Sequence, residues 1–378
     1  MKIWIATAAL ALLSLLPHTA HAQDRAPDRV AVLTMGPGDH PFARFGHNAI
    51  LLEWRRERLA LVYNYGTFAF DGLDGIRDFM AGRFRYWLSI STLSRTLRAY
   101  AAQNRTVVAQ ELALTEDERL RLARALELNA LPENREYDYD YYYDNCSTRV
   151  RDAVDRILGG AIKRQIQDPG RLTFREHTLR LTADGFWVYF GLDLALGPLT
   201  DRPTTRWDET FIPQELQQSL TGVKLLRDGK ETPLVSREVT LVSADRLPER
   251  REPPNRVAGF ALAGIALGGV LAALGRAGAK RAGARAAYAL SSGLLGLVLG
   301  LLGCVFFFFW AFTKHWSAFR NFNLLLFTPW ALVLASTAVG VLRAQPRALR
   351  LSHWIITASA GTALLALVSA LIPGFGQD

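Results

Sequence analysis

The stretch Tyr143-Asp-Asn-Cys-Ser-Thr-Arg149 is the most informative part of this chain, because it predicts the start of a helix at an isolated cysteine. Apolar residues follow it at helical spacing, at Val150, Val154, Ile157 and Leu158. Asp144 or Asn145 is the natural N-cap, so Cys146 falls in the first turn. Free backbone N–H groups and the helix dipole favour a thiolate there. We therefore predict a nucleophilic Cys146 whose thiol pKa is lowered.

The N-terminus is typical of a secretory signal peptide. Lys2 supplies the positive charge, residues 3–16 the apolar region, and Ala20-His-Ala22 a small-residue cleavage site, giving a signal peptide at 1–22. An uncleaved anchor is the alternative. Export leads to an oxidising compartment, where cysteines normally pair or are absent. The other cysteine, Cys304, lies in an apolar run typical of a membrane span, which leaves Cys146 without a disulfide partner.

The net charge of +9 belongs to the C-terminal third. Residues 256–378 hold ten Lys or Arg and one acid, whereas residues 23–255 hold 33 basic and 34 acidic residues. The N-terminal part is therefore close to neutral, which argues against nucleic acid as a partner. Four apolar segments long enough to cross a bilayer follow residue 256, at about 257–275, 286–312, 324–342 and 354–375.

Basic loops orient these four segments. The loops after the first and third segments are rich in arginine and lysine, at Arg276, Lys280, Arg281, Arg285, Arg343, Arg347 and Arg350. By the positive-inside rule these two loops are cytoplasmic. We therefore expect an extracytoplasmic domain at 23–245, a charged and proline-rich linker at 246–256, and a transmembrane domain at 257–375.

The candidate general base for the thiol, His47, lies on the first of two predicted strands. Residues 45–54 and 59–68 predict an antiparallel hairpin, because only a short charged connection separates them. His47 and Asn64 then point to one face of the sheet. A histidine with an asparagine to orient its ring is the Cys–His–Asn logic of thiol catalysis. The alternative is a small buried Cys146 beside a structural histidine.

Other segments give coarser expectations. Residues 115–118 predict a capping box before a helix, and residues 174–196 a largely helical segment with weak points at Gly185 and Gly191. Residues 223–242 predict a hairpin, and residues 137–143 an extended tyrosine-rich approach to the cysteine. Aromatic and arginine side chains in residues 71–87 suit a surface that dips into lipid headgroups, with an ordinary core as the alternative. No cluster has metal-ligand spacing, so we expect neither a metal nor another cofactor.

Three motifs together resemble the periplasmic domain of the Lnb-type lipoprotein N-acyltransferases. They are Gly46-His-Asn48 on a strand, Tyr63-Asn-Tyr-Gly66 on the next strand, and Asn145-Cys-Ser-Thr-Arg149 opening a helix. The resemblance covers most of residues 30–245 and extends to the loop between the second and third spans. It implies an α+β protein, in which a circularly permuted papain-like (NlpC/P60-like) periplasmic domain precedes a four-helix transmembrane region.

The resemblance also implies a reaction and a location. In this reaction Cys146 takes an acyl chain from a phospholipid donor as a thioester, with His47 moving the proton. The chain then passes to the N-terminal amine of a lipoprotein acceptor, at the periplasmic side of a multi-pass inner (cytoplasmic) membrane protein. Asn64 is the expected third member, where related permuted acyltransferases often have a second histidine. Substrate contacts are expected from Asn48, Asn145, His315, Asn321 and Asn323.

The sequence also allows other interpretations of these residues and of the function of the protein. Interfacial capping is the alternative role for His315, Asn321 and Asn323. For the whole protein, the alternatives are a papain-like cell-wall peptidase or amidase, and a non-catalytic membrane receptor or assembly protein.

Overall fold

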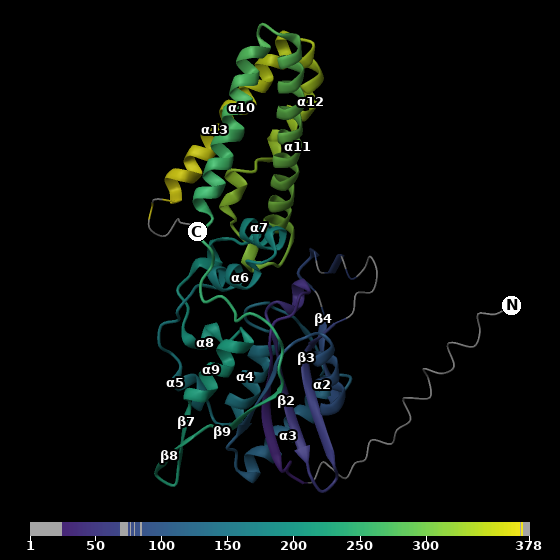
Figure 1. Cartoon of the computed structure of the whole chain (residues 1–378), viewed down its shortest axis with the longest axis vertical. Helices are drawn as coiled ribbons and strands as arrows, with labels where there is room; N and C mark the ends of the chain where they lie inside the picture. The colour runs from purple at the N-terminus through teal and green to yellow at the C-terminus, as the bar shows by residue number, and fades with distance from the viewer. Residues whose placement is uncertain are drawn as a thin grey trace, which may run out of the picture.

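The computed structural model describes residues 25–68, 75, 77–78, 80–83, 85–370 and 372. The expected signal peptide and part of the segment 71–87 lie outside these residues. Within them the chain is an α+β protein, in which an antiparallel sheet domain is followed by four apolar helical segments (Figure 1).

A seven-stranded antiparallel sheet forms the centre of the domain, in the order β6-β4-β3-β2-β1-β5-β9. Its strands are β1 (Arg29–Met35), β2 (His47–Trp54), β3 (Leu59–Thr67), β4 (Arg85–Thr92), β5 (Val107–Leu112), β6 (Glu136–Asp138) and β9 (Val235–Val242). The expected hairpin is confirmed, because β2 and β3 pair antiparallel from Ile50 opposite Tyr63 to Trp54 opposite Leu59.

Helices cover both faces of this sheet. On one face α3 (Glu116–Ala130), α4 (Cys146–Ile157) and α9 (Pro213–Gly222) pack against alternate residues of the central strands. On the other face α2 (Leu93–Ala102) packs against the intervening residues. Burial on both faces explains why β1 and β2 are almost continuously apolar instead of alternating with polar residues.

Most local predictions hold, with two corrections. Thr115 and Glu118 form the expected capping box at the start of α3. The helical region 174–196 is two helices, α6 (Phe174–Thr182) and α7 (Phe186–Ala195), with Gly185 between them. The predicted hairpin turns at Asp228, but its second half divides into a short strand and β9, which joins the main sheet. The remaining elements are α5 (Ala161–Gln165), α8 (Arg206–Glu209), β7 (Lys224–Arg227), β8 (Lys230–Pro233), η2 (Pro41–Ala43) and η3 (Pro198–Asp201).

The C-terminal region contains four candidate membrane spans, as expected. They are α10 (Val257–Gly278), α11 (Ala282–Phe312), a third span at Phe322–Leu342, and a fourth that begins at Pro346, earlier than predicted, and forms α13 (Pro346–Ala370). The third span is interrupted, because the short turns η5 (Phe322–Leu325) and η6 (Pro329–Ala331) precede α12 (Leu332–Leu342). Glycines bring α11 close to it: a methyl group at Gly296 would lie 2.5 Å from the Cβ of Leu334.

The linker before α10 is held against the domain. Arg180 donates to the carbonyl oxygen of Arg250 over 2.9 Å and forms an ion pair with Glu249 at 3.2 Å. Arg256 donates to the carbonyl oxygen of Ala183 over 2.7 Å. Residues 246–256 are therefore a strap across α6, not the flexible spacer that their composition suggests. In Figure 1 the basic turns between α10 and α11 and between α12 and α13 lie at the end of the bundle away from the domain.

Candidate functional site

Cys146 is the first residue of α4, and its side chain is 9% exposed. The N-cap is Asn145, whose side-chain oxygen accepts from the backbone N–H of Ser147 over 2.8 Å and of Thr148 over 2.9 Å. The amide nitrogen of Asn145 donates to the carbonyl oxygens of Tyr141 and Phe211. Both ends of this amide are thus occupied, so Asn145 holds the start of the helix and offers no free group to a substrate.

The thiol lies where β2 and β3 separate. The ladder between these strands ends at Ile50, although β2 begins at His47. Asn48 is paired with Thr34 of β1 but has no partner in the β3 ladder, and its backbone instead hydrogen-bonds the sulfur of Cys146. Opposite it, Gly66 has a φ of 83°, and a methyl group there would lie 3.4 Å from the Cβ of Cys146. A glycine is required at this position by the backbone conformation, and the cysteine packs directly over it.

His47 and Asn64 are brought together as the sequence predicts. The side chain of Asn64 donates to the carbonyl oxygen of Val62 over 3.1 Å and to the hydroxyl of Ser91 over 3.2 Å. Its oxygen accepts from the imidazole of His47, an interaction that raises the pKa of that ring. The half-buried ring also lies parallel to the Tyr100 ring of α2, with 6.4 Å between centroids. Asn64 therefore fixes the ring orientation.

The structure reverses the predicted ionisation of the thiol. Burial raises the pKa of Cys146, outweighing the hydrogen bonds from the backbone of Asn48, Ser147 and Cys146 itself. Burial, followed by the positive charge of Arg105, lowers the pKa of His47 to about 4. Both groups are thus neutral at pH 7. The expected low thiol pKa is wrong for this resting state, because the cost of burying a thiolate exceeds its stabilisation by the helix N-terminus.

Sequence reasoning missed Arg105, a buried residue at the same end of the sheet. It precedes β5, where Val107 lies opposite Met35, and Met35 in turn lies opposite His47 on β2. Arg105 and Val107 are two residues apart, so both side chains belong to the α2 face on which His47 lies. The charge of Arg105 lowers the pKa of both His47 and Cys146. The signal in the sequence is weak, a lone arginine after a turn.

At the candidate site the backbone of Asn48, and not its side chain, contacts the sulfur of Cys146. Its amide is fully buried and donates to the hydroxyl of Thr34 over 2.9 Å and to the carbonyl oxygen of Leu33 over 3.3 Å. The amide nitrogen thus holds Asn48 to β1, whereas its side-chain oxygen is buried without a partner among the described residues, so the predicted substrate contact stays a prediction. The interaction with β1 fixes the strand whose N–H meets the sulfur.

The tyrosine-rich segment before Cys146 turns instead of running extended to the helix. Strand β6 ends at Asp138, and the carboxylate of Asp140 then accepts from the backbone N–H of Tyr142 over 2.9 Å and of Tyr143 over 2.8 Å. The other oxygen of Asp140 accepts from the indole N–H of Trp316. Trp316 also packs against the rings of Tyr142 and Tyr143, with centroids 5.5 and 4.9 Å away. The loop between the second and third spans thus contacts the segment that leads into the candidate site.

The other predicted residues of that loop bind α7. The amide of Asn321 donates to the carbonyl oxygens of Leu194 and Ala195 over 2.7 and 3.0 Å. The amide of Asn323 donates to that of Leu194 over 3.0 Å. The ring of His315 lies 5.5 Å from that of Phe309. The two asparagines cap the end of α7 and hold this loop to the domain, which agrees with the interfacial capping alternative.

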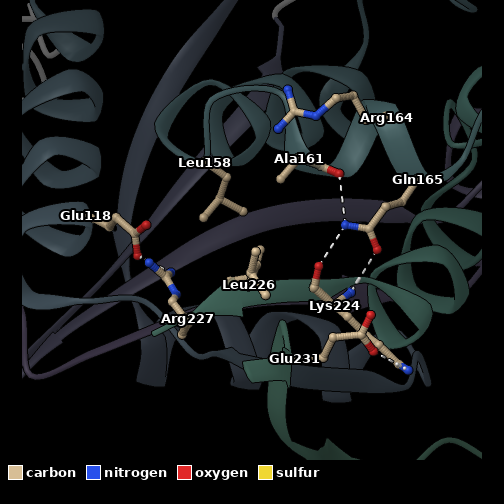
Figure 2. Close-up of a pocket in the computed structure, with 10 residues that line it drawn as sticks. Glu118, Leu158, Ala161, Arg164, Gln165, Lys224, Leu226, Arg227 and Glu231 are labelled. Atoms are coloured by element: carbon tan, nitrogen blue, oxygen red, sulfur yellow. Dashed lines mark hydrogen bonds and ion pairs between the residues drawn. The ribbon is translucent and has the colours of Figure 1, made fainter. Parts of the chain in front are cut away.

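Two other features of the domain, a surface hollow and the buried His177, have structural explanations. Figure 2 shows a hollow between α5 and the β7–β8 hairpin, far from the membrane helices in Figure 1. Two ion pairs line it, Arg227 with Glu118 and Lys224 with Glu231, and its third cation, Arg164, donates to the carbonyl oxygen of Gly159. The described residues include no group of three or more His, Cys, Asp or Glu that would hold a metal ion. His177 is buried and bonded to Glu209 over 2.8 Å, which makes it structural.

The geometry defines a class of protein, a membrane-embedded chain whose extramembrane α+β domain carries a cysteine at a helix start and a His–Asn pair at the same end of its sheet. The family comparisons agree. The model of the Lnb N-terminal periplasmic domain matches residues 18–183, and that of the Lnb transmembrane domain matches residues 269–374. The chain belongs to the Lnb-type family with a C-terminal membrane region. No curated protein and no solved structure matches it.

Proposed function

We propose that this protein is a thiol acyltransferase of the inner membrane, with a circularly permuted papain-like periplasmic domain. It moves an acyl chain from a phospholipid to the N-terminal amine of a lipoprotein through a thioester at Cys146. His47 is the base and Asn64 orients its ring. The observation that carries the proposal is the junction of the two regions: the segment that leads into Cys146 is bonded to the outer loop of the membrane helices through Trp316 and Asp140.

The surroundings of the site support a lipid substrate. Phe42, 47% exposed, packs on Phe68, and Phe68 packs on Tyr86, with centroids 5.6 and 5.0 Å apart. Tyr86 stacks at 4.0 Å on Tyr139, which borders Gly66 beneath the thiol. A row of aromatic side chains therefore connects an exposed phenylalanine with the sulfur. Such a row suits an acyl chain better than a cell-wall peptide, and the contact of the membrane-region loop at Trp316 with the segment before Cys146 favours the same substrate.

The first half-reaction forms the thioester. The imidazole of His47 takes the proton of the Cys146 thiol as the sulfur attacks the ester carbonyl carbon of the donor. The backbone N–H of Cys146, which Asn145 leaves uncapped, is a donor for the oxyanion that forms. Collapse of the tetrahedral adduct breaks the ester C–O bond, and the imidazolium returns the proton to the leaving alkoxide. The products are a lysophospholipid and an acyl-thioester enzyme.

The second half-reaction consumes the thioester. The free amine of the acceptor attacks the thioester carbonyl, and His47 accepts the proton that the nitrogen loses. The C–S bond breaks, and the thiolate recovers that proton from the imidazolium. The product is an amide, and the resting thiol and imidazole are restored. The low pKa of His47 means that the ring is unprotonated at the start of each half-reaction and can accept a proton. The membrane region keeps both lipid-linked substrates at high effective concentration.

The test is the covalent intermediate. The purified full chain is incubated with phospholipid vesicles without an acceptor, and its intact mass is measured for wild type, Cys146→Ala and His47→Ala. We expect a hydroxylamine-sensitive fatty-acyl adduct on the wild type and on neither variant. Cys304→Ala is the matched control, since it removes the other thiol and should keep the adduct. Absence of an adduct from the wild type would reject the thioester mechanism.

The acceptor is tested separately. A synthetic diacylglyceryl lipopeptide with a free N-terminal amine is added to the loaded enzyme, and the adduct should disappear as N-acylated lipopeptide forms. The same peptide with its amine acetylated is the control. Release of free fatty acid at equal rates with both peptides would identify a hydrolase instead of a transferase. Cleavage of a peptide bond would favour the peptidase alternative.

A further inference from the structure

Arg105 differs from every other buried arginine that the structure describes. Four arginines in these residues are buried, Arg105, Arg151, Arg175 and Arg180. The last three form ion pairs with Asp152, with Asp193 and Asp201, and with Glu215 and Glu249. Arg105, only 5% exposed, has no carboxylate within ion-pair distance among the described residues. Buried charges in proteins are normally paired, so this guanidinium lacks its counter-ion.

Neutral groups accept hydrogen bonds from only some of the N–H donors of the Arg105 guanidinium. Its Nε donates to the carbonyl oxygen of Gly36 over 2.7 Å, and Nη1 to the side-chain oxygen of Gln103 over 3.5 Å. Nη2 has no hydrogen-bond partner in the part of the chain that the structure describes. The guanidinium lies 4.7 Å from the ring centroid of Tyr100, the ring that also lies parallel to His47. An unsatisfied N–H of a charged group, held in this way beside the candidate base, fits a ligand anion.

We propose, building on the acyltransferase function above, that Arg105 binds the phosphate of the phospholipid donor. Only the glycerol carbons separate this phosphate from the ester carbonyl that the thiol attacks. A donor whose carbonyl meets Cys146 therefore has its phosphate close to the groups around the thiol, and Arg105 is the buried cation whose charge acts on both Cys146 and His47. The glycine-rich loop over Arg105 packs closely: a methyl group at Gly38 would lie 3.0 Å from the Cδ of Arg105. The loop holds the guanidinium in place before the lipid arrives.

The Cys146 thiolate is the competing counter-ion. It exists only during the reaction, and the backbone of Asn48 and Ser147 lowers the thiol pKa more than Arg105 does. For His47, by contrast, the charge of Arg105 is the largest influence after burial. The geometry places Arg105 on the histidine side of the site, because its guanidinium lies 4.7 Å from the ring centroid of Tyr100, the ring that lies parallel to His47.

The experiment compares two acyl donors in wild type, Arg105→Gln and Arg105→Lys. One donor is a phosphatidylcholine vesicle, and the other is a p-nitrophenyl fatty-acid ester, which has no phosphate. We expect Arg105→Gln to lower the rate of thioester formation from the phospholipid roughly ten- to a hundredfold, the range of a lost charge-assisted hydrogen bond. The rate from the neutral ester should change less than about threefold, and Arg105→Lys should be intermediate with the phospholipid. Arg98→Gln, which removes an exposed charge of α2, is the matched control.

A binding assay separates this proposal from the acyltransferase function. Soluble glycerophosphocholine should protect Cys146 of the wild type from alkylation and should not protect the Arg105→Gln variant, whether or not a thioester ever forms. Equal loss of rate with both acyl donors would overturn the proposal and assign Arg105 to the thiolate or to folding. An unchanged thermal unfolding midpoint of the variant without ligand would show that the variant is folded. Stronger protection by inorganic phosphate than by glycerophosphocholine would reject the lipid phosphate as the ligand.

Discussion

The resting proton state of Cys146 and His47 gives the sharpest prediction. With the thiol pKa raised and the pKa of His47 lowered to about 4, the pair is neutral at physiological pH. We predict that the rate of alkylation of Cys146 by iodoacetamide rises about tenfold per pH unit from pH 6 to pH 9, because only the thiolate reacts. No inflection is expected near pH 6.5, where an unperturbed histidine titrates.

The magnitude follows from the reference pKa of the thiol. A cysteine with the ordinary value of 9.0 is about 1% thiolate at pH 7, and burial places Cys146 below that fraction. The alkylation rate at pH 7 should therefore be less than about a hundredth of its limit at high pH. A thiolate–imidazolium pair, as expected from the sequence, would instead react at nearly its full rate at pH 7.

The assay uses the full chain in detergent with Cys304 replaced by alanine, so that mass spectrometry follows a single thiol. Cys146→Ala in the same background gives the blank. His47→Gln should leave the slope unchanged, because a neutral ring does not stabilise a thiolate as an ion pair does. A plateau in rate below pH 7 that disappears in His47→Gln would refute the reasoning and restore the ion pair.

Three further predictions follow. Asn64→Asp places a carboxylate beside the ring of His47 and should raise the pKa of that ring, so the acid limb of the pH profile of thioester formation should move to higher pH. An unchanged acid limb would show that Asn64 does not interact with the ring. Gly66→Ala introduces a methyl group at a positive φ and should destabilise the fold by about 1–2 kcal/mol and slow alkylation of the thiol, whereas Gly191→Ala, with open space around it, should do neither. Trp316→Phe keeps the ring packing and loses the indole hydrogen bond, so acyl transfer from vesicles should fall severalfold while alkylation stays at the wild-type rate; a parallel fall in both would mean that Trp316 only supports folding.

Local sequence signals were sufficient for the elements that carry the candidate site. The hairpin of β2 and β3 was predictable because its short charged connection allows only an antiparallel pair. The start of α4 was predictable because Asn145 is a strong N-cap before an amphipathic stripe. Period two then placed His47 and Asn64 on one face, and the structure agrees.

Properties that depend on distant packing were not predictable in this way. The thiol pKa was wrong because the helix terminus is a local feature, whereas the burial of Cys146 comes from strands and tyrosines far along the chain. Arg105 was missed because it stands out only by having no carboxylate within ion-pair distance among the residues that the structure describes, and ion pairing cannot be seen in a sequence. The sequence predicts a linker at 246–256 but not its attachment to the domain, because its anchor Arg180 belongs to α6.

The contacts between the two regions bear on what the membrane helices do. A tether that only raised local concentration would need one span and a free linker. Here the strap is bonded to α6, the outer loop caps α7 through Asn321, and Trp316 is bonded to the turn that leads into Cys146. These three attachments fix the orientation of the domain on the bundle, so the opening between β2 and β3 keeps one position relative to the membrane. A fixed position matters for a substrate whose ester lies at a set depth in a bilayer and has little effect on a soluble one. The same attachments make the membrane helices part of the candidate site, because a shift of the outer loop moves the turn that positions the cysteine.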